Sequence, residues 1–130
     1  MNIDFNKISL CEGSSVVEKF ENGNYQVTTI LYIMYEDDYY GGLRIGEVRI
    51  ITSSLNMKYI EHIEINKDCR NSGIATHILT KYFKGYFISA GNLRVTSLYN
   101  RIGRGQTHFT DEECRTLAYN TGMYGTFIIE

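Results

Sequence analysis

One stretch, residues 58–86, changes its hydrophobic period once, and this change constrains the fold more than any other feature. Its first part, Y-I-E-H-I-E-I at 59–65, alternates as a β-strand does. Strict alternation predicts one face made of Tyr59, Glu61, Ile63 and Ile65 and an opposite face made of Ile60, His62 and Glu64. We therefore expect a strand here whose two faces differ in polarity.

From Ser72 onward the apolar residues recur in pairs every four positions, from Ile74–Ala75 to Tyr86–Phe87. This spacing predicts an amphipathic helix of about four turns. Its polar side is predicted to face solvent and carries Thr76, His77, Thr80, Lys81 and Lys84.

The segment R-N-S-G-I-A at 70–75 joins the predicted strand to the predicted helix. A helix start offers unpaired backbone N–H groups and the positive end of the helix dipole. Gly73 and Ala75 are small enough to let an anion approach the backbone. The sequence therefore predicts an anion-binding turn between strand and helix.

This stretch resembles the central motif of the GNAT superfamily of acetyl-CoA-dependent N-acyltransferases. That motif is a strand followed by Arg/Gln-x-x-Gly-x-Gly/Ala at the start of a helix, and Arg70, Gly73 and Ala75 match it. Cys69 stands where an aromatic residue is common in the family. The resemblance covers roughly residues 25–130. The two helices that wall the acceptor site in family members have no counterpart in the N-terminal third.

The resemblance implies acetyl-CoA as co-substrate and a primary amine as acceptor, either a small molecule or a peptide. The coenzyme's pyrophosphate is expected at a cradle made of Arg70, Asn71, Ser72, Gly73, Ile74 and Ala75. Its pantetheine arm is expected along the backbone of Ile63 and Ile65, where the strand diverges from its neighbour, predicted at 93–99.

A primary amine has a pKa near ~10 and is mostly protonated at neutral pH, so the reaction needs a base. Glu61 matches the acidic position of some relatives and is the predicted base, with Glu64 as the alternative. Relatives often use a tyrosine four residues before a Gly-aromatic pair as general acid. With Gly122–Met123 as that pair, the nearest tyrosine is Tyr119, one position beyond the match; Tyr99 and Tyr124 are alternatives.

The rest of the chain predicts an α+β fold in a single domain over residues 1–130. An Asn-Gly pair at 22–23 between apolar runs predicts a hairpin of strands at 15–20 and 25–35. Further strands are expected at 3–8, 43–52, 93–99 and 126–129, and a second, C-terminal helix from the capping box at 110–113 to about 120. Together they form a mixed, mostly antiparallel, GNAT-like sheet around the strand–cradle–helix unit.

Composition excludes several classes of protein. The longest apolar runs fall short of the ~20 residues that span a bilayer, and three widely spaced cysteines predict reduced thiols and a cytoplasmic location. No histidine pair has metal-ligand spacing, so no metal is expected. A net charge of −2 makes nucleic acid an improbable partner.

Two interpretations stay open beside the transferase. The loop R-I-G-R-G at 101–105 could contact an acidic acceptor, the coenzyme's adenosine phosphate or a tRNA backbone, or could have no contact. A non-catalytic module of the same fold, binding a protein or nucleic acid, is the alternative function. The N-terminal third lacks the helices that wall the acceptor site in the family, and a second copy of the chain could complete that site, which suggests a homodimer.

Overall fold

The computed structural model describes residues 3–70, 72–90, 93–106 and 125–130. In this part of the chain a seven-stranded sheet has the order β1-β2-β3-β4-β5-β7-β6. Its strands are β1 (Ile8–Lys19), β2 (Tyr25–Asp37), β3 (Gly41–Ser53), β4 (Lys58–Ile65), β5 (Phe87–Ser89), β6 (Gly103–Gln106) and β7 (Thr126–Ile129). Neighbours are antiparallel except for β4 and β5, which are parallel. The predicted α+β class and mostly antiparallel sheet are confirmed.

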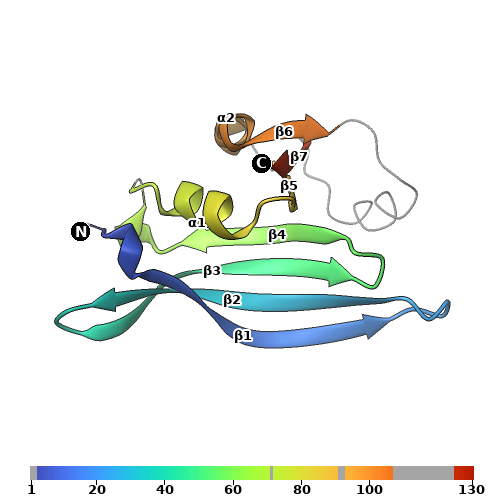
Figure 1. The fold of residues 1–130 in the computed structure, drawn as a ribbon, viewed down its shortest axis with the longest axis horizontal. Helices are drawn as coiled ribbons and strands as arrows, with labels where there is room; N and C mark the ends of the chain where they lie inside the picture. Colours follow the sequence, from blue (N-terminus) through green and yellow to red (C-terminus); the bar gives the residue numbers. More distant parts are fainter. Residues whose placement is uncertain (1–2, 71, 91–92, 107–124) are drawn as a thin grey trace.

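Two α-helices and two 3-10 turns complete the described fold. They are η1 (Phe5–Lys7), η2 (Lys67–Cys69), α1 (Ile74–Tyr82) and α2 (Leu93–Ile102). The helix α1 connects the parallel strands β4 and β5 and lies beside β4, while α2 lies farther along with β6 (Figure 1). No helix among the described residues is long and apolar enough to cross a membrane.

The hairpin of β1 and β2 forms at the Asn-Gly pair, as predicted. Phe20 N–H donates to the carbonyl of Asn24 at 2.8 Å, and Gly23 N–H donates back to the carbonyl of Phe20 at 3.1 Å. The strand at 43–52 and the final strand at 126–129 are also confirmed, as β3 and β7. The N-terminal segment differs, because Phe5 lies in the turn η1 and the first strand begins only at Ile8.

A β-bulge at Glu61 makes the predicted alternation of β4 wrong. Arg49 pairs with His62 and Ile50 pairs with Ile60, so Glu61 is an extra residue on β4. An extra residue moves all later side chains to the opposite face. Ile63 therefore shares its face with Ile60 and packs against the same core, whereas Tyr59 belongs to a second cluster on the other face.

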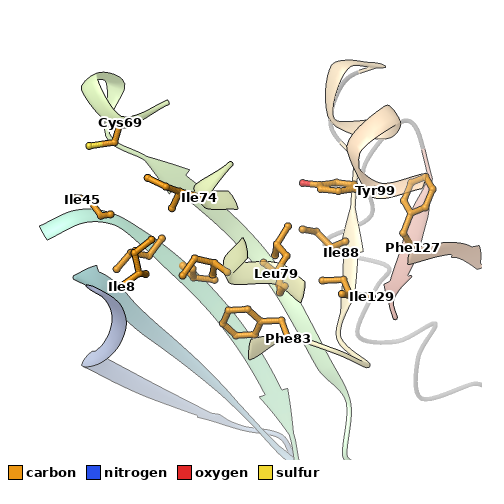
Figure 2. Packing of buried hydrophobic residues seen from close by; sticks show 14 of the residues in the cluster. Ile8, Ile45, Cys69, Ile74, Leu79, Phe83, Ile88, Tyr99, Phe127 and Ile129 are labelled. Atoms are coloured by element: carbon orange, nitrogen blue, oxygen red, sulfur yellow. The ribbon is translucent and has the colours of Figure 1, made fainter. Parts of the chain in front are cut away.

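The main core lies between the sheet and the two helices. Ile33, Val48 and Ile60 contribute from the sheet, and Ile78 and Leu79 from α1; all are almost fully buried. Figure 2 shows the α1 side chains turned towards the strands and the α2 residue Tyr99 closing the far side near Phe127. Each of these apolar side chains stabilises the fold by about 1.5–3 kcal/mol through its burial.

The first helix is shorter than its sequence period predicts. It ends at Tyr82, and Gly85 then takes φ 84°, a left-handed conformation that glycine adopts at little cost. This turn directs the chain out of the helix, so Phe87 pairs with Tyr59 as the first residue of β5. The four-residue repeat continues past the helix end because Phe87 is buried in the strand that follows.

Two predictions for residues 93–105 are wrong. The predicted strand at 93–99 is the helix α2, whose inward positions Val95, Leu98, Tyr99 and Ile102 follow helical spacing and pack on the main core. The segment predicted as a loop forms β6, in which Arg104 pairs with Ile128 of β7. The Arg104 side chain also forms an ion pair of 2.8 Å with the Glu130 carboxylate. The predicted helix at 110–120 lies outside the described residues.

Replacing Gly46 by alanine should destabilise the protein by about 1–3 kcal/mol, the usual cost of overpacking. An added Cβ would collide with the carbonyl oxygen of Glu64 on β4, which is backbone and cannot rotate away. Gly42→Ala in the same strand is the matched control, because its nearest neighbours are 3.8 Å away and its free energy of unfolding should hardly change. Chemical denaturation of both variants measures the difference, and equal stabilities would contradict this account.

Candidate functional site

The helix start predicted to bind an anion is built as expected in its backbone. Gly73 precedes α1 with φ 82°, a conformation that side chains disfavour, and it provides no side-chain cap to the helix. Ser72 instead donates its hydroxyl to the carbonyl of Cys69 at 2.5 Å, which closes the turn after η2. Ile74 is buried and Ala75 half-buried, so these two residues fix the first turn in the core. Asn71 lies outside the described residues.

The side chain of Arg70 folds back over the end of β4. Its Nε donates to the carbonyl of Ile65 at 2.8 Å, and its Nη2 lies 3.9 Å from a carboxylate oxygen of Glu64. The guanidinium remains about half exposed. Its Nε is thus hydrogen-bonded and its Nη2 lies in an ion pair with Glu64.

Two residues of β4 beyond Ile60 turn their backbone polar groups away from β3. Asn66 N–H donates to the carbonyl of Ile45 at 2.8 Å, which fixes that pair as hydrogen-bonded. Hydrogen-bonded and non-hydrogen-bonded pairs alternate along an antiparallel ladder. The backbone groups of Ile63 and Ile65 must therefore point to the other side, as the bond from Arg70 to the Ile65 carbonyl also indicates.

That other side of β4 is paired for only two residues. The parallel ladder with β5 consists of Tyr59 with Phe87 and Ile60 with Ile88. Beyond it, β5 continues towards β7, since Ala90 N–H donates to the carbonyl of Gly125 at 2.9 Å. Among the described residues, no strand pairs with β4 on that side from Glu61 to Ile65. The described pairing between these two parallel strands ends at the bulge.

Glu61, the predicted base, stands at this end of the pairing. Its carboxylate receives a hydrogen bond of 3.5 Å from Arg49 and its side chain is about one-third exposed. Glu64 is more exposed and lies 3.3 Å from His62 as well as close to Arg70. Of the two candidate bases, Glu61 is thus the one beside the end of the β4–β5 ladder.

Tyr99, one of the alternative general acids considered from the sequence, lies on the described helix α2. It stands four residues before Gly103, where the helix ends, which is the spacing that the family resemblance requires. The prediction missed this match because it assigned 93–99 to a strand. Arg104 stands where the family has an aromatic residue. Tyr119, the predicted acid, lies outside the described residues.

The phenol of Tyr99 is held in its neutral form. Burial, with a smaller contribution from Tyr59, raises its pKa to about 12. Its ring packs edge-on against Phe127, with centroids 5.8 Å apart, and Figure 2 shows its hydroxyl turned away from that ring towards Ile74. The hydroxyl is therefore directed over the region between α1 and the end of the β4–β5 ladder.

A small cluster of hydroxyl groups lies on the opposite face at the same point. Burial raises the pKa of Tyr59, while a hydrogen bond with Ser89 acts in the opposite direction and the nearby charge of Glu61 adds to the rise. Ser89 in turn shares a 3.1 Å hydrogen bond with Thr126. These mostly buried hydroxyl groups lie close to the charge of Glu61 at the end of the ladder.

The N-terminal turn packs against the helix start, which the sequence did not predict. The ring of Phe5 stacks on His77 with centroids 4.6 Å apart, and its Cζ lies 3.3 Å from the position of a Cβ on Gly73. His77 is consequently half-buried, contrary to the prediction that it faces solvent, and its Nε2 has no hydrogen-bond partner among the described residues. Burial, then the charge of Lys81, lowers the pKa of His77.

Comparisons with protein-family models, with curated proteins and with solved structures yield no match to this chain. A functional proposal therefore rests on the sequence resemblance and on the geometry described above.

Replacing Phe5 by alanine should raise the pKa of His77 towards its ordinary value, because the ring that desolvates the imidazole is removed. NMR titration of the His77 side chain measures the shift. A lowered pKa means that the folded state favours the neutral imidazole. The free energy of unfolding therefore falls as the pH falls below about 6.5, where the unfolded chain takes up the proton more readily. Phe5→Ala should reduce that loss. Phe20→Ala, at an exposed phenylalanine in the first hairpin, is the control, and an identical pKa in both variants would contradict the stacking.

Proposed function

We propose that this protein transfers an acetyl group from acetyl-CoA to a primary amine. The observation that carries the proposal is the free side of β4 beyond Ile60, which leads directly to a helix that begins at a left-handed glycine. An extended amide-containing arm can bind such a strand edge as an additional strand does. A pyrophosphate suits the N–H groups of a helix start.

The residues present fit such a coenzyme in part. Ile63 offers a backbone N–H and carbonyl, and Ile65 offers its N–H, because the Ile65 carbonyl is already bonded to Arg70. Arg70 precedes the first residue of α1 by four positions and adds a positive charge to this segment. This pattern supports the coenzyme subsite that the family resemblance implies.

An ammonium acceptor loses two protons in all, one before attack and one as the amide forms, and the coenzyme departs as a thiolate. The amine nitrogen bonds to the thioester carbonyl carbon, and the carbon–sulfur bond then breaks. We assign Glu61 to accept the amine proton, directly or through one water, because it stands where the pairing of β4 and β5 ends. Its bond with Arg49 orients the carboxylate.

We assign Tyr99 to the leaving group. A phenol with a pKa of about 12 holds its proton more tightly than an ordinary thiol, with a pKa near ~8.5, would. Complete proton transfer to the thiolate is therefore unfavourable, and the contribution of Tyr99 is a hydrogen bond to the sulfur as its charge develops. The thiolate then takes its proton from solvent.

A coenzyme-independent binding module is the second candidate, and one observation favours it. Phe5 lies against Gly73, and the side chain of Arg70 turns back to β4, so both narrow the approach to the helix start. In such a module the same turn would serve only to anchor the N-terminal segment.

Acetyl-CoA at 100 times its Kd should stabilise the protein by about 2.7 kcal/mol, measured as a thermal shift. Gly73→Ala should weaken coenzyme binding, because a side chain then stands at the helix start. Gly85→Ala is matched to it, since both glycines have nearly the same positive φ and both replacements strain the backbone. Equal coenzyme affinity of the two variants, or no shift for the parent protein, would reject the cradle.

Glu61→Gln should lower kcat by about 10²-fold or more, the usual contribution of a general base, and remove its limb of the pH–rate profile. Tyr99→Phe should also lower kcat while leaving KM similar, because the bond to sulfur strengthens only as the thiolate forms. Tyr86→Phe, at another partly buried tyrosine, is the control. Release of free thiol measures the rates, and unchanged kcat in both test variants would remove these two assignments.

A further inference from the structure

The outer edge of β1 is open and apolar over its second half. β1 stands at the end of the strand order and pairs on one side with β2; no strand of the described chain pairs on the other. Val16 is 67% exposed, Val17 54% and Phe20 44%. Lysines often protect such edges, and Lys19 stands at the end of this one, but the apolar residues exposed on both faces of β1 favour a partner strand.

The hydrogen bonds of the hairpin show which backbone groups are available at this edge. Tyr25 directs its N–H and carbonyl to Ser54, away from β1, so its pair with Lys19 is not hydrogen-bonded. By the alternation of antiparallel ladders, the pairs made by Val17 and Ser15 are of the same kind. The N–H and carbonyl groups of Ser15, Val17 and Lys19 therefore point outward.

We propose that two copies of this chain pair through β1 as antiparallel strands around a two-fold axis at Val17. In a symmetric antiparallel pair, an outward residue must stand opposite another outward residue. A register centred on Val17 uses all three outward residues. Val17 stands opposite Val17 of the second copy, and Ser15 stands opposite Lys19 of the second copy. The sheets of the two copies become continuous.

The charges at this edge complement each other in that register. The hydroxyl of Ser15 donates to the carboxylate of Glu12 at 3.2 Å, so Glu12 reaches forward to Ser15 across the bulge between them. Lys19 of the second copy, opposite Ser15, is thereby brought to the Glu12 carboxylate. The two-fold axis repeats the contact, which gives two ion pairs between residues that the hairpin of a single copy keeps apart.

The apolar side chains also match across the axis. On one face of the paired strands, Val17 contacts Val17 of the second copy. On the other face, Phe20 is diagonal to Val16 of the second copy, a separation that an aromatic side chain spans. The bulge at Gly13 and Ser14 ends the regular edge, so the pairing stops after Ser15 and the assembly closes as a dimer.

The mass in solution tests the dimer. Sedimentation from micromolar to several hundred micromolar protein should show a rise from 15.0 kDa towards twice that mass. Lys19→Glu should raise the dimer Kd on the order of tenfold, since it turns two attractions into repulsions. Adding Glu12→Lys to it should restore association, while circular dichroism checks that each variant folds.

Cysteine pairs test the register, in a background with Cys11 and Cys114 replaced by serine. Val16 stands opposite Glu18 of the second copy in a non-hydrogen-bonded pair, with Cα atoms about 4.5 Å apart. The double variant Val16→Cys/Glu18→Cys should therefore form intermolecular disulfides. Val16→Cys alone should form no intermolecular disulfide, because position 16 of the second copy is a diagonal neighbour about 7–8 Å away.

Equal cross-linking by the single and double variants would overturn the register centred on Val17. A chain that stays at 15.0 kDa at every concentration, with no cross-linking in either variant, would overturn the dimer and leave the edge for a strand of a different protein. Because neither experiment uses a coenzyme, their outcome is independent of the acetyltransferase proposal.

Discussion

The extra residue at Glu61 is the constraint on which the site and much of the core depend. Upstream of it, Ile60 fills the core between β4 and α1; downstream, Ile63 and Ile65 return to the same face. A regular strand would have placed these isoleucines on opposite faces, with one of them away from the core. The bulge therefore allows one strand to end its pairing with β5 while continuing to pair with β3.

This arrangement has a chemical consequence. Pairing with β5 stops at Ile60, so on that side β4 has no strand neighbour within the described chain, while the side chains of Ile63 and Ile65 pack on the main core. A row of backbone donors and acceptors held by a packed core is a rigid edge. Rigid edges bind extended ligands without first having to order themselves, which lowers the entropic cost of binding.

Sequence reasoning identified the elements whose signal is local and failed where the tertiary structure decides. The Asn-Gly hairpin and the strand before the cradle carry their own turn chemistry or alternation, and both are present. Residues 93–99 were predicted as a strand because valine and threonine favour strands. Burial of Val95, Leu98 and Tyr99 against the core selects a helix instead. A bulge leaves no mark in composition, so the faces of β4 could not be assigned.

The geometry of the candidate site could be foreseen from the sequence only where it is local. Gly73 and Arg70 lie next to each other in sequence, and their placement follows from the turn that they form. The ring of Phe5 reaches Gly73 from more than sixty positions away, and no local pattern indicates that contact. Tyr99 illustrates a different failure, because its spacing to Gly103 was visible but only has meaning once 93–102 is a helix.

The position of the proposed dimer edge relative to the site follows from the strand order. β1 is separated from β4 by β2 and β3, so pairing of two copies at β1 leaves the end of the β4–β5 ladder open in each copy. Both edges nevertheless obey the same rule: backbone groups that a sheet leaves unpaired need a partner of extended shape. At β1 the exposed valines and the self-complementary charges support the proposed pairing with another protein strand, whereas at β4 the adjacent helix start and Arg70 support the proposed binding of an anionic, extended small molecule. The chemistry beside each edge, more than the edge itself, distinguishes the two partners.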